Sequence, residues 1–130
     1  MLGLVMLSVA VIFWRLGEGS IGDYDEAAYA EISKTGGQFV NRDLYVFVID
    51  TQGNTLAHGF NKKLIGKNML ELRDPDGVFF IKKFIEVAGS KGKGWVDYKF
   101  SDPITKKIGK KSTYVAGYEN LVVGCGIYKQ

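Results

Sequence analysis

The chain has 130 residues, of which 46% are apolar and 24% charged, a globular composition that fits one domain and excludes a disordered chain. Its single cysteine, Cys125, excludes an internal disulfide, and its single histidine, His58, excludes a two-histidine metal centre. The net charge of +3 is uneven, because residues 91–130 carry eight lysines and three acidic side chains. This basic third suits an anionic partner but is too diffuse to indicate nucleic acid, and a small carboxylate would need only one or two of its lysines.

The chain begins with an uncharged run, Met1–Trp14, which Arg15 ends. As a helix, these 14 residues would span about 21 Å, short of the roughly 30 Å hydrocarbon core of a membrane. The length is typical of the apolar region of a signal peptide, although no basic residue precedes the run and no A-x-A cleavage site follows it. We therefore expect residues 1–19 to be an export segment or a membrane anchor, with a buried N-terminal helix as the alternative. Residues 20–130 would then form one domain outside the cytoplasm, in the periplasm.

A short helix and a β-hairpin are expected next. Asp23 and Glu26 have the spacing of a capping box, and Gly36–Gly37 ends the helix that they begin. Leu44–Ile49 is a continuous β-branched and aromatic run, which predicts a central strand buried on both faces. A short turn separates it from Thr55–Phe60, so the two strands form a hairpin.

A second helix and three more strands follow. The apolar stripe of Val78–Ala88, with lysines on the other face, predicts an amphipathic helix that Gly89 ends. Ser90–Gly94 has the composition of a linker. The last three strands are expected at Trp95–Phe100, Lys111–Ala116 and Leu121–Tyr128. Since the connections between strands are short, the sheet is predicted to be antiparallel and the fold to be α+β.

Four stretches of this chain resemble a single Cache domain: DLYVFVIDTQGNTLAHG, LIGKNMLEL, DPDGVFFIKKFIEVA and the segment from GKGWVDYKF to GCGIYK. The resemblance covers about Ala28–Lys129, and its most specific parts are Gly94–Tyr98, Lys111–Val115 and Gly126–Tyr128. Cache domains are extracytoplasmic sensor modules of bacterial chemoreceptors and sensor kinases. The resemblance implies a PAS-like fold: a five-stranded antiparallel sheet with an N-terminal helix on one face and a ligand pocket on the other.

The same resemblance implies a function. The ligand would be a small organic acid of the acetate, propionate, pyruvate or lactate class, and the signal would pass to a membrane receptor or kinase partner. Ligand binding would stabilise one packing of the N-terminal helix on the sheet. We expect a free-standing sensor domain, and a homodimer is left open. The alternative is a structural or dimerisation module of the same fold that binds no small molecule.

Lys111 and Tyr98 are the leading candidates for the ligand site. A lysine that points inward from the fourth expected strand would hold a carboxylate by a charge-assisted hydrogen bond, although a solvated, charged turn is the alternative. Trp95 lies three residues from Tyr98 and Tyr114 three from Lys111, so strand alternation puts the members of each pair on opposite faces unless a bulge intervenes. Tyr98 is favoured over Trp95 because its hydroxyl can donate to a carboxylate; the other ring would pack under the N-terminal helix.

Three further side chains are weighed at the site. His58 could donate to an anion or respond to pH, although a lone histidine on a strand is more often structural. Tyr45, on the first long strand, is a weaker candidate for the pocket. Cys125 lies between two glycines in an apolar strand and is interpreted as a small core residue.

The sequence contains no motif of a known catalytic centre. It has no G-x-S-x-G, no phosphate-binding glycine loop and no H-E-x-x-H, and its carboxylates form no obvious pair. Asp74–Gly77 lacks the further spaced oxygen ligands of a calcium loop. We therefore expect no catalytic residues, no metal site and no cofactor.

Overall fold

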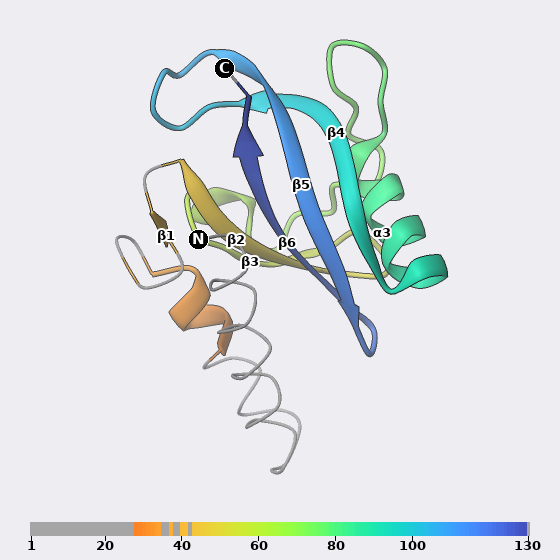
Figure 1. Cartoon of the computed structure of the whole chain (residues 1–130). Helices are drawn as coiled ribbons and strands as arrows, with labels where there is room; N and C mark the ends of the chain where they lie inside the picture. Colours follow the sequence, from red (N-terminus) through yellow and green to blue (C-terminus); the bar gives the residue numbers. More distant parts are fainter. Residues whose placement is uncertain (1–27, 35–36, 38–39, 42, 130) are drawn as a thin grey trace.

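The computed structural model describes residues 28–34, 37, 40–41 and 43–129 (Figure 1). The expectations for Met1–Trp14, for the Asp23–Glu26 capping box and for the boundary at residue 20 fall outside these residues. Within the described residues, no helix is long and apolar enough to cross a membrane.

The described part of the chain forms one antiparallel sheet of six strands (Figure 1). Their order is β1-β2-β6-β5-β4, and β3 also pairs with β2. The strands are β1 (Val40–Asn41), β2 (Leu44–Asp50), β3 (Thr55–His58), β4 (Lys93–Ser101), β5 (Ile108–Tyr118) and β6 (Leu121–Tyr128). The five expected strands are therefore confirmed, and β1 adds a two-residue pairing with Leu44 and Tyr45.

Each face of the sheet buries its own core, because β2 is apolar on both sides. Leu44, Val46 and Val48 face residues 28–32, a helical turn whose Ile32 is fully buried. Tyr45, Phe47 and Ile49 alternate with them and face helix α3 (Phe80–Lys91), which lies beside β4 in Figure 1. A short 3₁₀ helix, η1 (Lys62–Leu64), follows β3.

The end of α3 differs from the expectation. The helix does not end at Gly89, and Ser90–Gly94 is not a linker: Ser90 and Lys91 continue the helix and Lys93 begins β4. Gly92 takes the left-handed conformation that ends a helix, with φ of 78°, so the connection needs only one residue. Gly89 and Gly92 could each end the helix, but only Gly92 adopts the left-handed conformation.

Two strand ends also differ. β3 ends at His58 rather than at Phe60, because the backbone N–H groups of Phe60 and Asn61 donate to His58 Nδ1 at 3.2 and 2.8 Å and turn the chain. β5 begins at Ile108, three residues before Lys111. The polar turn before it is shorter than expected because the Asp102 carboxylate accepts the N–H groups of Ile104 and Thr105 and closes the turn.

Candidate functional site

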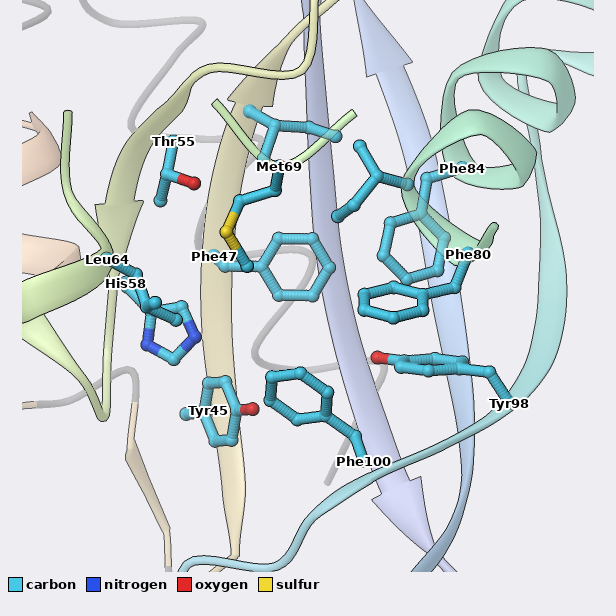
Figure 2. Close-up of a pocket in the computed structure, with 12 residues that line it drawn as sticks. Tyr45, Phe47, Thr55, His58, Leu64, Met69, Phe80, Phe84, Tyr98 and Phe100 are labelled. Carbon is cyan, nitrogen blue, oxygen red and sulfur yellow. The ribbon is translucent and has the colours of Figure 1, made fainter. Parts of the chain in front are cut away.

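A small cavity lies between the aromatic face of the sheet, α3 and the loop after η1 (Figure 2). It offers about 30 Å³ to the centre of a water-sized molecule. Most of its lining side chains are aromatic or aliphatic: Tyr45, Phe47, Ile49, Leu64, Met69, Phe80, Ile81, Phe84, Tyr98 and Phe100, with Thr55 and His58 as the polar additions. This is the face opposite the helical turn of residues 28–32, as the fold resemblance implied.

Lys111 lies beside this cavity and is almost completely buried, with 1% of its surface exposed. Its Nζ donates to Tyr45 Oη at 2.9 Å and lies 4.1, 5.0 and 5.5 Å from the ring centres of Tyr45, Tyr128 and Phe100. The ion pairs formed between described residues use Lys82, Lys99 and Lys129, and none of them involves Lys111. Burial lowers the pKa of Lys111 to about 7. The three rings form an aromatic cage around an ammonium that has no carboxylate partner among these residues.

Lys111 and Tyr98 also line an open, charged hollow, which offers about 300 Å³ to the centre of a water-sized molecule. Its remaining lining residues are mostly charged: Asp74, Asp76, Val78, Asp97, Lys99, Lys110 and Lys129. Two ion pairs cross it, from Lys99 to Asp76 at 3.0 Å and from Lys129 to Asp97 at 3.5 Å. Lys111 therefore lies between the apolar cavity and this open, charged hollow.

A glycine on β6 makes room for Lys111. Lys111 and Thr113 point to the same side of β5, and Gly126 pairs with Thr113 in the register of β5 and β6. A Cβ atom at Gly126 would lie 2.6 Å from Lys111 Cε, so a larger residue there would displace the lysine stem. Gly124 has the same relation to Phe47, whose ring occupies the place of the missing side chain.

Tyr98 lies opposite Lys111 in the register of β4 and β5, which are adjacent antiparallel strands. Its hydroxyl shares a hydrogen bond of 2.9 Å with Thr113 Oγ1, and its ring stacks on Phe80 at 4.6 Å. Burial raises the pKa of Tyr98 well above its ordinary value, so its hydroxyl stays protonated. It is therefore a neutral donor or acceptor next to the buried ammonium.

His58 lines the cavity beside Tyr45, with ring centres 4.7 Å apart (Figure 2). Its Nδ1 accepts the two backbone N–H groups described above, so the proton of the neutral ring belongs on Nε2. Burial lowers the pKa of His58 to about 4, with a further contribution from the Lys111 charge. The ring is therefore neutral at ordinary pH. Its Nδ1 holds the turn after β3, and its Nε2–H remains as a hydrogen-bond donor.

Tyr128 belongs to the site, although the sequence reasoning did not place it there. Its ring centre lies 5.0 Å from Lys111 Nζ, and its Oη donates to the Ser101 carbonyl at 2.6 Å. Burial raises the pKa of Tyr128 to about 12. Its position in the sequence could have predicted this, because an antiparallel hairpin with a turn at residues 119–120 puts Tyr128 opposite Lys111.

Trp95 and Tyr114 lie on the opposite face from the cavity, as the alternation argument predicted for one member of each pair. Their rings meet edge to face at 5.4 Å, and Trp95 is 51% exposed, so it is not packed under a helix. Cys125 is fully buried in the aliphatic core of that face, and burial raises the pKa of its thiol to about 12. The structure therefore brings together Lys111, Tyr98, Tyr45 and His58, and separates Trp95 and Tyr114 from them.

Comparison with known proteins identifies the family. The model of single Cache domain 2 matches residues 15–130. The sensor histidine kinase MctS of Rhizobium johnstonii is 34% identical over 110 residues, which cover 82% of this chain and 24% of the kinase. The chain thus spans about a quarter of that relative.

Two solved structures have the same fold over nearly the whole chain. A periplasmic sensor domain of a chemotaxis protein is 26% identical with a TM-score of 0.82, and the match covers 98% of this chain and 92% of that one. A Cache chemosensory domain solved for its recognition of carboxylic acids is 23% identical with a TM-score of 0.86, covering 99% and 90%. The resemblance in sequence, the α+β fold and the family match therefore agree, and the chain belongs to the single Cache domain 2 family, whose members are sensor domains of chemoreceptors and histidine kinases.

Proposed function

We propose that the domain binds a small organic acid of the acetate, propionate, pyruvate or lactate class outside the cytoplasm and signals through a receptor or kinase partner. The observation that carries the proposal is Lys111, a fully buried ammonium beside a cavity and without a carboxylate partner in the described part of the chain. A buried charge that is not paired is costly, and a ligand carboxylate would remove that cost.

The donors around Lys111 suit a carboxylate. An ammonium has three N–H donors, and Tyr45 Oη accepts one of them. The Tyr98 hydroxyl and His58 Nε2–H are two neutral donors that line the same cavity from opposite edges of the sheet, on β4 and β3. A carboxylate that meets Lys111 and one of these neutral donors is bound by charge-assisted hydrogen bonds, which are about twice as strong as neutral ones.

The remaining walls suit a short apolar tail. Phe47, Phe80 and Phe84 present no hydrogen-bonding group to the cavity. One water-sized centre needs roughly 10–15 Å³, so a cavity of about 30 Å³ holds two or three such centres. That size supports an acid of two or three carbons.

The relatives support the sensing part of the proposal. MctS is a sensor kinase, and the similar chemosensory domain recognises carboxylic acids. A ligand shifts a conformational equilibrium only by its difference in affinity for the two states. Here that difference would come from drawing Lys111 Nζ away from Tyr45, with a consequent change in how the sheet packs its two cores.

One observation favours the alternative, a PAS-like structural module without a ligand. The cavity is small, and aromatic rings fill most of the space between α3 and the sheet. A module of this kind would bind none of the acids, whereas the proposed sensor binds at least one.

Calorimetry with acetate, propionate, pyruvate and lactate tests the proposal on the full chain and on Lys111→Met. Methionine keeps much of the bulk of the lysine stem, so the fold should survive and affinity should fall by about 1.5–3 kcal/mol, roughly tenfold to more than a hundredfold. Lys107→Met is the matched control, because Lys107 is exposed, lines neither the cavity nor the hollow, and should leave affinity unchanged. Equal affinities for wild type and Lys111→Met would remove Lys111 from the site, and absence of binding by the wild type would favour the alternative.

A further inference from the structure

The cavity has two unlike ends (Figure 2). At one end lie the hydroxyls of Tyr45 and Tyr98 and the ring of His58, next to Lys111. At the other end the side chain of Met69 lies over the ring of Phe47, and Thr55 is the polar lining residue there. If the carboxylate of an acid occupies the first end, its apolar tail points toward the second.

The backbone that carries Met69 is held in place independently of its side chain. Its N–H donates to the Gly53 carbonyl at 2.8 Å, which joins the loop to the turn between β2 and β3. Asn68 strengthens this link, since its side chain bonds the Gln52 carbonyl and Asn54 Oδ1 at 3.0 and 2.9 Å. Shortening the Met69 side chain therefore removes no hydrogen bond of the loop.

Met69 also differs from the other walls in burial and shape. Phe47, Ile49 and Phe84 are buried in the core of the sheet and α3, so truncating them would remove core packing. Met69 is only half-buried, and its unbranched side chain can adopt many shapes. Leu64, the other lining residue from the connection between β3 and α3, lies beside His58 at the polar end (Figure 2).

From this placement we infer that Met69 is the end wall of the cavity and sets the length of the acid tail that the domain accepts. The inference rests on the proposed function, because it assigns a specificity-determining residue to the same site. Met69→Ala removes Cγ, Sδ and Cε, and this opens space for about two or three more carbons of the ligand. Each methylene that becomes buried adds about 0.8 kcal/mol, or roughly a fourfold gain in affinity.

The experiment measures the affinity of straight-chain acids from acetate to hexanoate by calorimetry on the full chain. The wild type should bind the two- and three-carbon acids best. Met69→Ala should move the optimum to about five carbons and bind pentanoate at least tenfold more tightly than the wild type does. Met69→Val, which removes less, should give an intermediate shift and provides the test if the alanine variant does not fold.

Two controls separate the possible results. Leu72→Ala shortens an apolar side chain of the same loop that does not line the cavity, and it should keep the wild-type order of acids. Met69→Leu keeps a side chain of similar volume and should keep the wild-type optimum of chain length. If the acids bind the wild type, and Met69→Ala and Met69→Val rank their affinities in the same order as the wild type does, this inference is overturned while the proposed function stands. A wild type that binds none of the acids would overturn the proposed function, and this inference with it.

Discussion

The two faces of β2 are built from different kinds of side chain and serve different purposes. Leu44, Val46 and Val48 form an aliphatic core that contains no charged group among its members. Tyr45 and Phe47, one residue along, belong to an aromatic core that contains the cavity and borders Lys111. Both kinds of side chain pack closely in a protein interior, but only aromatic rings offer faces that attract a cation. The comparison teaches that one strand can give stability on one side and a site for binding on the other.

β6 repeats this division with smaller residues. Val123 and Cys125 face the aliphatic core, while Gly124 and Gly126 face the rings. Without those glycines the Phe47 ring and the Lys111 stem would have no place. The pattern G-C-G is therefore required by the side chains on the neighbouring strands, β2 and β5.

The largest expected effect breaks the aromatic face. Phe84 is fully buried, and its ring lies 5.4 Å from Phe47 and 5.3 Å from Tyr98. Phe84→Ala should lower the free energy of unfolding by about 3–5 kcal/mol, measured by urea denaturation. Val48→Ala on the aliphatic face should cost about 2 kcal/mol, since fewer buried atoms are lost. The exposed Ile104→Ala should change stability by less than about 0.5 kcal/mol, and similar losses for all three would refute the distinction.

The next effect is a rise of stability with pH in the ligand-free domain. The pKa of Lys111 is about 7 in the folded state, whereas an unfolded lysine titrates near 10.4. Between these values the unfolded state binds more protons, so the free energy of unfolding increases with pH by up to about 1.4 kcal/mol per pH unit. Urea denaturation across this range should show the rise in the wild type and not in Lys111→Met. Above about pH 10 the raised pKa values of Tyr45 and Tyr98 oppose it.

Affinity for an acid should change with pH in the opposite direction. Above about pH 7 the free site holds a neutral Lys111 amine, so binding a carboxylate requires uptake of a proton. The affinity should therefore decrease with rising pH above that value, by a factor that approaches ten for each pH unit. Calorimetry in buffers of different ionisation enthalpy measures the proton uptake directly. His58 stays neutral throughout, since its pKa is about 4, and a flat affinity profile would show that the ligand does not pair with Lys111.

The smallest effects compare single residues on the two sides of β4. Tyr98→Phe removes a hydroxyl from the cavity and should weaken acid binding about two- to tenfold. Trp95→Phe changes a side chain on the other side and should leave affinity unchanged. Calorimetry on both variants decides whether the site lies on one face only. A loss for Trp95→Phe equal to that for Tyr98→Phe would contradict the assignment.

Much of this arrangement could be predicted from the sequence. Alternation predicted that Trp95 and Tyr98, and likewise Lys111 and Tyr114, lie on opposite faces, and a hairpin predicted that β4 and β5 are adjacent; the register that puts Tyr98 opposite Lys111 comes from the structure. These predictions succeeded because they depend on a period of two and on one turn.

Other features could not be predicted from local patterns. The aromatic cage around Lys111 gathers Tyr45, Phe100 and Tyr128 from three strands, so it depends on several registers at once. The His58 tautomer depends on how the chain turns after β3, and the choice of Gly92 over Gly89 depends on where α3 meets β4. Each of these is decided by tertiary packing rather than by a short stretch of sequence.

The position of Cys125 has a practical consequence for kinetics. Its thiol is the only one in the chain, is fully buried, and has a pKa of about 12, so a thiol reagent cannot label it in the native state at neutral pH. Labelling then requires β6 to separate from its neighbours β2 and β5. The rate at which Cys125 is labelled therefore reports how often the sheet opens at β6. If a ligand slows this labelling, the ratio of the two rates gives the free energy by which binding stabilises the closed sheet.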